Sequence, residues 1–336
     1  MKLFGAIPHD NAPRFREAGA HVESWFWRLN HPSERRAVWI KATVFKPVAG
    51  EATADVWCIH FDGSTVTGRR KTVPLSEASF SSHAQPLSVE IAGARFTLDD
   101  QGGQLKGAVA ELAWDIEFTT SGGAVAEPLC IFPNRRLLVA PVPRSKLVTP
   151  LPTITATGVL RCGDTQWDLS GWIGSQGHNW GPEHTEQYVW SQCVFPGTDG
   201  PAVMVEGVSA RIRLGRWLTP WLSALVVRRG DQVWRFDRMV DVWNHKTAIH
   251  DMSWALHIKG PAGEATLKVS ADPDEMACLG YHNPDGRLSY CMNSKLSRVT
   301  LRVNPRKDDA FECHSEHGGA LEFLRGEPDE RLGEVI

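Results

Sequence analysis

A chain of 336 residues carries 36 basic and 39 acidic side chains, for a formal net charge of −3. This length exceeds what one hydrophobic core usually holds, so we expect two domains of about 150 residues each. Because charges of both signs are interspersed, no long-range field would gather nucleic acid or an anionic lipid surface, and we exclude both as partners.

The remaining composition excludes several further classes of protein. Seven cysteines are scattered without a Cys-x-x-Cys pair, so neither a disulfide framework nor a zinc site is predicted. No stretch of apolar residues is long enough to span a bilayer. The apolar stretch at the N-terminus is also shorter than the apolar core of a signal peptide, so we expect a cytoplasmic protein. No phosphate loop, dinucleotide fingerprint or Gly-x-Ser-x-Gly motif is present, and we expect no metal and no cofactor.

Short alternating segments bounded by Gly, Pro, Asn and Asp recur at intervals of about ten residues, which predicts an antiparallel, all-β fold. In the first segment, 22–29, Glu23, Trp25 and Trp27 share one strand face, because successive side chains alternate between faces. The segment 37–45 follows a polar turn and completes a hairpin. Further strands are predicted at 55–61, 87–91, 94–99, 104–119, 153–160, 165–174, 187–195, 202–213, 221–228, 232–243, 252–258, 264–270, 287–303 and 319–324.

The segment 128–152 interrupts this pattern with six prolines. It is too apolar for a flexible linker, since Leu137-Leu138-Val139 lies within it. We therefore expect an ordered segment that crosses between two parts of the molecule.

A short internal similarity divides the chain. Residues 25–29 resemble 188–192 at an offset of 163, and residues 37–41 resemble 202–206 at an offset of 165. A repeated aromatic hairpin predicts two similar halves, an N-terminal domain of residues 1–181 and a C-terminal domain of residues 182–336. Each half has the size of a single β-barrel.

The densest cluster of chemically active side chains is 174–193, which contains His-Asn-Trp-Gly at 178–181 and lies where the two halves should meet. Glu183, His184 and Glu186 follow in a loop, where solvated side chains are a better interpretation than metal ligands or an acid pair. The segment 282–286 predicts a hairpin turn, and a position for Tyr281 at a pocket mouth is the weaker alternative.

The cluster resembles the tocopherol cyclases, whose pattern is Asn-Trp-Gly, six variable residues and an aromatic-x-Trp-x-Gln-Cys strand. Residues 179–181 and 188–193 match that spacing. The same family and the related carotenoid 1,2-hydratases open with a Glu-(Gly/Ser)-Trp-aromatic strand, which 23–26 resembles. This resemblance implies two tandem lipocalin-like antiparallel β-barrel domains packed side by side, with an isoprenoid- or polyene-like ligand in or between them.

One position departs from the hydratase pattern. The hydratases carry Asp immediately before the His of this motif, where this chain has Gly177. The proton donor that this Asp would supply is missing, so the resemblance supports a fold and a pocket more than a particular reaction.

Cyclisation or hydration of an alkene needs an acid and a cavity in which a carbocation survives away from water. Glu23 is the first candidate acid, because desolvation among indoles should raise the pKa of its carboxyl group. His178 is the second, although a structural role in binding backbone groups is an equal alternative. Indole faces stabilise a cation by roughly 0.5–2 kcal/mol. The candidate ligand contacts are Trp25, Trp27, Asn179, Trp180, Tyr188, Trp190 and Gln192.

Three functions stay open at this stage. The chain is a cofactor-independent enzyme that cyclises or hydrates a bulky hydrophobic small molecule, or a non-catalytic carrier or storage protein for such a ligand, since both need the same aromatic wall. A purely structural protein is the third alternative, and only the missing Asp favours it. Exposed strand edges would also allow a homodimer.

Overall fold

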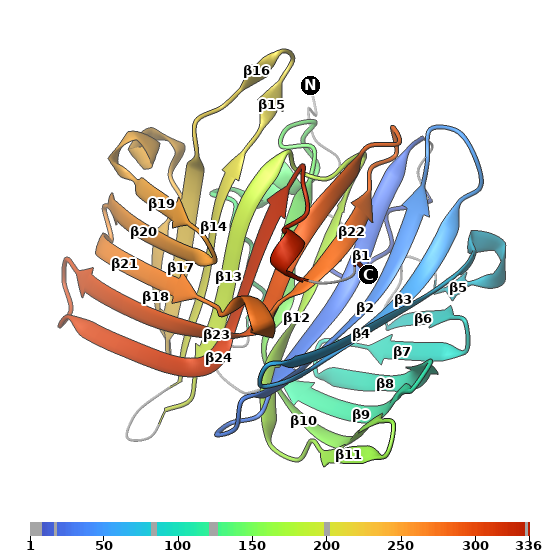
Figure 1. Cartoon of the computed structure of the whole chain (residues 1–336). Coiled ribbons are helices and arrows are strands. Elements are labelled where there is room, and N and C mark those ends of the chain that lie inside the picture. The colour runs from blue at the N-terminus through green and yellow to red at the C-terminus, as the bar shows by residue number, and fades with distance from the viewer. Residues whose placement is uncertain (1–8, 17–18, 82–85, 121–126, 198–201, 333–334) are drawn as a thin grey trace.

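The computed structural model describes residues 9–16, 19–81, 86–120, 127–197, 202–332 and 335–336. Throughout these ranges the chain forms antiparallel strands and short 3₁₀ helices, without an α-helix, in two large sheets that curl side by side (Figure 1). The expected all-β, barrel-like fold is confirmed. No helix in the described ranges has the length and apolarity that a membrane crossing requires.

The first sheet has twelve strands in the order β4-β3-β2-β1-β12-β10-β9-β8-β7-β6-β5, and β11 pairs with β10. Its elements are β1 (His21–Asn30), β2 (Arg36–Lys46), β3 (Thr53–Asp62), β4 (Thr65–Pro74), η1 (Leu75–Glu77), β5 (Ser79–Phe80), β6 (Leu87–Ile91), β7 (Ala94–Leu98), β8 (Gly102–Val109), β9 (Leu112–Thr120), η3 (Arg135–Leu138), β10 (Lys146–Cys162), β11 (Thr165–Asp168) and β12 (Trp172–Gly181).

The second sheet has ten strands in the order β18-β17-β14-β13-β24-β23-β21-β20-β19, and β22 pairs with β23. A separate hairpin, β15-β16, projects from it (Figure 1). The elements are β13 (Gln187–Phe195), β14 (Val203–Arg211), β15 (Arg213–Leu214), β16 (Trp217–Leu218), β17 (Leu222–Arg229), β18 (Gln232–Phe236), η4 (Met239–Asn244), β19 (Lys246–His250), β20 (Ser253–Gly260), β21 (Gly263–Ser270), η5 (Pro273–Glu275), β22 (Ala277–His282), β23 (Leu288–Pro305), β24 (Phe311–Arg325) and η6 (Glu330–Leu332).

The two sheets repeat one strand order. The run β4-β3-β2-β1-β12-β10-β9-β8-β7 corresponds, strand by strand, to β18-β17-β14-β13-β24-β23-β21-β20-β19. The offset of 163 predicted for the first strand is nevertheless wrong, because it equates Trp27, inside the first sheet, with Trp190, which lies between the sheets. Side chains alternate between the two faces of a strand, so β1 and β13 place equivalent side chains on the same face only when the offset is even.

Each curled sheet encloses an apolar core, and a third apolar layer lies between the sheets. Inside the first sheet, Trp27 stacks on Phe96 with ring centroids 5.3 Å apart. Trp254 is buried inside the second sheet. In the layer between the sheets, Phe26 of β1 meets Trp190 of β13 edge-on, with centroids 6.3 Å apart. The outer faces of β1 and β13 therefore contribute to one shared aromatic layer.

The segment between β9 and β10 crosses to the second sheet and returns, as expected for 128–152. The Arg235 side chain of β18 donates hydrogen bonds to the carbonyl groups of Cys130 and Phe132, at 2.8 and 3.1 Å. Leu129 and Ile131 pack with apolar residues of the second sheet. This crossing segment closes one side of the space between the sheets.

Several predicted strand limits are wrong for local reasons. The expected strand 104–119 is two strands, since Ala110 adopts a φ of 50° in a tight turn between β8 and β9. The expected strand 165–174 divides into β11 and β12 at Gly171, whose φ is 79°. β4 was not predicted, because this edge strand is rich in Thr, Arg and Lys and lacks apolar alternation.

Candidate functional site

The His-Asn-Trp-Gly motif forms the end of β12 rather than a connecting segment between two halves. In the register with β1, His178 lies opposite Trp25. Because side chains alternate along β12, His178 faces the inside of the first sheet, whereas Gly177 and Asn179 face the second sheet. Asn179 and Trp180 both reach the space between the sheets, whereas His178 does not.

Glu23 and His178, the two candidate catalytic residues, form a fully buried pair. His178 Nε2 lies 2.8 Å from Glu23 Oε1, and His21 Nε2 lies 3.1 Å from Glu23 Oε2. The backbone N–H groups of Arg14 and Phe15 donate to the same carboxylate at 2.9 and 2.7 Å. Four donor groups thus surround Glu23.

His178 is held on both ring nitrogens. Its Nδ1 lies 2.5 Å from the carbonyl oxygen of Asp10, which can only accept, and its Nε2 faces the Glu23 carboxylate. A ring that donates from both nitrogens is an imidazolium, so the geometry describes an ion pair.

The expected rise in the pKa of Glu23 is wrong. Burial disfavours the charged carboxylate, but hydrogen bonds and charge from His178 and His21 outweigh it and lower the pKa of Glu23 to about 2. At neutral pH the carboxylate carries no proton to donate. The pair holds the N-terminal segment 9–15 against the first sheet.

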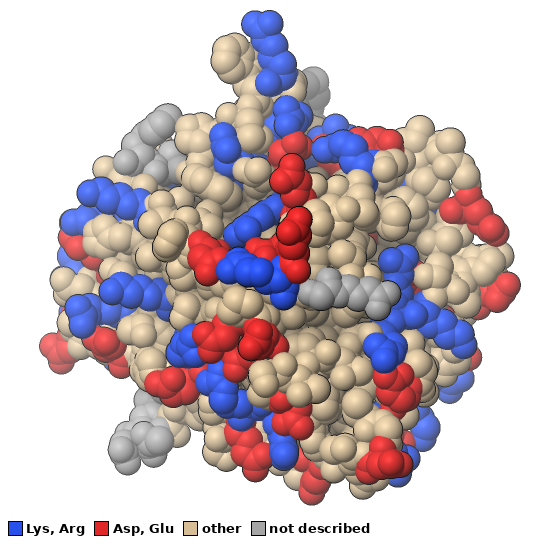
Figure 2. All heavy atoms as spheres, in the orientation of Figure 1, with Lys and Arg blue, Asp and Glu red and all other residues tan. Residues whose placement is uncertain are grey.

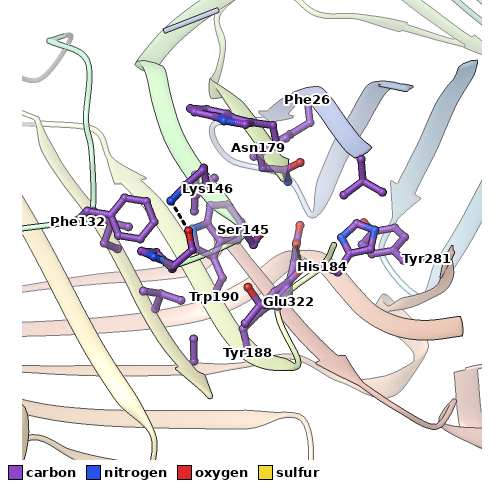
Figure 3. A pocket seen from close by; sticks show the side chains of 18 of the residues that line it. Phe26, Phe132, Ser145, Lys146, Asn179, His184, Tyr188, Trp190, Tyr281 and Glu322 are labelled. Atoms are coloured by element: carbon purple, nitrogen blue, oxygen red, sulfur yellow. Dashed lines mark hydrogen bonds between the residues drawn. The ribbon is translucent and has the colours of Figure 1, made fainter. Parts of the chain in front are cut away.

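A cavity of about 130 Å³ lies between the two sheets (Figure 3). Its aromatic lining consists of Phe26, Trp39, Phe132, Trp180, Tyr188, Trp190 and Tyr281. Its polar lining consists of Lys41, Ser145, Lys146, Asn179, His184, Thr185 and Glu322. A cavity of about 150 Å³ in another protein holds one benzene molecule. This pocket, called the inter-sheet pocket below, is therefore large enough for one ring or a short branched chain.

Four of the predicted ligand contacts line the inter-sheet pocket: Asn179, Trp180, Tyr188 and Trp190. Trp25 and Trp27 do not, because both lie in the core of the first sheet. There Trp25 stacks on His178 with centroids 4.9 Å apart. Gln192 is also outside the lining, where its Oε1 accepts a hydrogen bond from Arg28 at 3.3 Å.

A chain of hydrogen bonds ends at the pocket wall. The Tyr188 hydroxyl group donates to Glu322 Oε2 at 3.3 Å, and Lys295 Nζ donates to Glu322 Oε1 at 2.6 Å. Burial raises the pKa of Tyr188 and of Tyr281 well above its usual value, so both phenols stay protonated. The wall therefore carries two neutral phenols beside a paired carboxylate, and the Tyr188 hydroxyl group already donates its hydrogen to that carboxylate.

His184 contradicts the expectation of a solvated loop. Its ring stacks on Tyr281 with centroids 5.1 Å apart, and the two lie side by side at one end of the pocket (Figure 3). Burial, and then the charge of Lys41, lower the pKa of His184 to about 3, so the ring is neutral. Glu183 and Glu186 are ion-paired with arginines rather than free in solvent.

The turn predicted at 282–286 is present, with Asn283 N–H donating to the carbonyl of Arg287 at 2.7 Å. The weaker alternative for Tyr281 also holds, since its ring lines the pocket. Lys41 was not proposed as a site residue, although the alternation in 37–45 places it on the face of Trp39. No sequence signal singles out Glu322.

The space where the hydratases carry an Asp is filled by an aromatic ring. A Cβ atom on Gly177 would lie 2.2 Å from Phe26 Cζ, closer than any real contact. Phe26 is 8% exposed and lines the inter-sheet pocket. Apolar surface therefore fills the space beside Gly177.

Glu206 of β14 is a second fully buried carboxyl group, behind the pocket wall. Trp190 Nε1 donates to its Oε1 at 2.9 Å, and the Thr149 hydroxyl group lies 2.9 Å from its Oε2. Burial raises the pKa of Glu206 to about 7, although these hydrogen bonds oppose the rise. Glu206 orients the Trp190 indole that lines the pocket.

Glu206→Gln is expected to raise the free energy of unfolding at pH 8 by about 3 kcal/mol and to change it little at pH 4.5. The folded pKa of about 7 lies above the ordinary value of 4.5, so ionisation of Glu206 costs the folded wild-type protein stability as the pH rises between these values. Urea unfolding of both proteins at the two pH values measures this difference. Glu117→Gln, on the exposed part of β9, is the matched control. An equal effect of Glu206→Gln at both pH values would contradict the assignment.

Comparisons with known proteins agree with this fold. No protein-family model matches the chain. Uncharacterized proteins of two Mycobacterium tuberculosis strains are 25% identical over 294 residues, which cover 88% of this chain and 84% of theirs.

Two solved structures share the architecture. A Nitrosomonas europaea protein, provisionally described as AttH, superposes with a TM-score of 0.56 and 12% identity, over 96% of this chain and 99% of its own. Kievitone hydratase from Nectria haematococca superposes with a TM-score of 0.54 and 12% identity, over 90% and 88%. The chain thus has a fold that a hydratase also has, while its likeness to tocopherol cyclases stays a prediction.

Proposed function

We propose that the chain binds an apolar, isoprenoid- or polyene-like small molecule in the inter-sheet pocket and adds water to one of its double bonds, or cyclises it. The supporting observation is the aromatic cavity between the sheets, which has hydroxyl, amine and carboxylate groups at its wall. The cavity of about 130 Å³ accommodates one end of such a molecule, and the rest would extend beyond it. Hydration by a protein of the same fold, kievitone hydratase, supports this reaction class.

The groups at the wall favour one kind of double bond. Tyr188 and Lys41 are weak acids, and an isolated alkene needs a strong one. A double bond conjugated to an oxygen-bearing group needs only a hydrogen bond or a weak acid at that oxygen while water attacks. Tyr188 is our candidate donor for that oxygen: its single O–H donates to Glu322 in the free protein and would turn to the ligand oxygen when the ligand binds.

Tyr188→Phe is expected to lower the rate of hydration about a hundredfold, because it removes the donor while keeping the ring that binds the ligand. Mass spectrometry first identifies the apolar compound that copurifies with the chain. That compound is then incubated with the protein in oxygen-18 water, and label in the product measures turnover. Dissociation constants, from tryptophan fluorescence, should change less than about tenfold.

Tyr290→Phe is the matched control, since Tyr290 packs on the core of the second sheet and not on the pocket. Its turnover should equal that of the wild type. If the wild type incorporates no oxygen-18 and yields no cyclised product, the enzymatic proposal fails. If both Tyr variants retain full activity, Tyr188 is not the donor.

A non-catalytic carrier is the second candidate, and the Phe26 ring over Gly177 favours it. A carrier needs an apolar wall and gains nothing from a strong acid. In that case the copurified compound is recovered unchanged after incubation, and Trp190→Ala lowers its affinity whereas Tyr188→Phe has little effect.

A further inference from the structure

Two lysines, Lys41 and Lys146, line the inter-sheet pocket, and a third, Lys295, binds Glu322 of its wall. Lys146 Nζ donates to the carbonyl groups of Leu137 and Ala140, at 2.7 and 2.8 Å, and to that of Pro143. Lys295 Nζ donates to Glu322. The three carbonyl groups fill the hydrogen-bond donors of Lys146, and the Glu322 carboxylate is the counter-ion of Lys295.

Lys41 differs from these two lysines, because its ammonium group lies against three aromatic rings. Nζ lies 4.1 Å from the ring centroid of Tyr281, 5.4 Å from Trp39 and 5.7 Å from Trp57. The residue is 3% exposed, and its side chain lines both the inter-sheet pocket and a smaller adjacent cavity. Over the described ranges, Nζ donates no hydrogen bond.

The neighbouring carboxylates are already neutralised. Glu322 is paired with Lys295 at 2.6 Å, and Asp55 is paired with Arg70 at 3.0 Å. Burial lowers the pKa of Lys41 to about 8, despite the charge of Glu322, as expected for a cation without a close counter-ion. A buried cation with no acceptor is costly unless a ligand supplies one.

We propose that Lys41 binds the carboxylate group of an apolar carboxylic acid whose hydrocarbon part occupies the inter-sheet pocket. The inference rests on the proposed function and names the head group of its ligand. A singly charged group fits because one ammonium group, that of Lys41, lacks a hydrogen-bond acceptor over the described ranges, whereas Lys146 and Lys295 have theirs. A carboxylate at Nζ would form the charge-assisted hydrogen bond that the aromatic rings cannot.

The test uses two probes with one hydrocarbon part, geranic acid and geraniol. Tryptophan fluorescence and calorimetry at pH 7 measure their dissociation constants. The wild type is expected to bind geranic acid roughly tenfold to a hundredfold more tightly than geraniol. Lys41→Met should abolish this preference and leave the affinity for geraniol within about threefold, because Met keeps a similar length and removes only the charge.

Lys71→Met, on exposed β4, is the matched control and should keep the preference for the acid. Circular dichroism and thermal unfolding verify that Lys41→Met is folded; Lys41→Gln serves as a second variant if it is not. Equal binding of both probes to the wild type overturns the role of Lys41 but leaves the pocket in place. If both Lys41 variants still bind geranic acid more tightly than geraniol, the role of Lys41 is overturned as well. Binding of neither probe argues against the proposed function itself.

Discussion

Glu23→Ala is expected to lower the free energy of unfolding by about 3–5 kcal/mol. The substitution leaves the His178 imidazolium buried without its counter-ion and removes the acceptor for two backbone N–H groups. A buried charge deprived of its partner costs more than the pair contributes when intact. Urea unfolding at pH 7, followed by circular dichroism, measures the loss.

The pair of Glu23 and His178 also predicts that the free energy of unfolding depends on pH in the acid range. The pKa of Glu23 is about 2 in the folded chain, below its ordinary value of 4.5, so the ionised carboxylate contributes stability above about pH 4.5. That contribution, about 3 kcal/mol, is lost as the pH falls from 4.5 through 2. The effect of Glu206 has the opposite sign, because ionisation of Glu206 destabilises the folded state as the pH rises. Glu23→Ala should therefore flatten the acid side of the stability profile.

Glu117→Gln, an exposed carboxylate on β9, should leave that profile unchanged. A Glu23→Ala protein with wild-type stability would show that the pair is not the anchor of the N-terminal segment. Unchanged ligand turnover in a folded Glu23 variant would agree with our view that this carboxylate is not the acid.

Period-2 alternation predicted much of the fold, because it depends only on neighbouring residues. It placed Glu23 and Trp25 on one face of β1, and both lie inside the first sheet. It also placed Trp39 and Lys41 together, and both line the inter-sheet pocket. The hairpin of β1 and β2 is local in the same sense, since one short turn joins the strands.

The role of Glu23 was not predictable from alternation, because the groups that set its pKa are distant in sequence. His178 reaches Glu23 across 155 positions. Arg14 and Phe15 reach it from an N-terminal segment that carried no strand signal. Without these donors, desolvation would raise the pKa, as we expected. Burial alone therefore does not determine the charge of a carboxyl group.

The site itself combines residues from both sheets, which explains why sequence patterns identified only part of it. Trp190 and Tyr188 were found through a motif, but Tyr281 and Glu322 come from β22 and β24. Their approach depends on how the outer faces of the sheets meet. No short-range pattern encodes that contact.

Gly177→Asp is expected to destabilise the fold by about 3 kcal/mol or more, because the new side chain must displace the Phe26 ring and bury a carboxyl group beside it. The reason is steric, since a Cβ atom at this position would come within 2.2 Å of Phe26 Cζ. Phe26→Ala alone should also cost about 3–5 kcal/mol, since it empties a packed site. Urea unfolding of both variants measures these two losses.

The double variant Phe26→Ala/Gly177→Asp tests whether the two positions compete for one space. If they do, its loss of stability should be smaller than the sum of the single losses by about 1–3 kcal/mol. Gly326→Asp, where nothing lies within 4 Å of the added atom, should cost little in either background and is the matched control. Strictly additive losses would show that Phe26 does not occupy the place of the hydratase acid. If the two substitutions are coupled and the double variant also incorporates more oxygen-18 than the wild type, the Phe26 ring beside Gly177 limits the reaction in this chain.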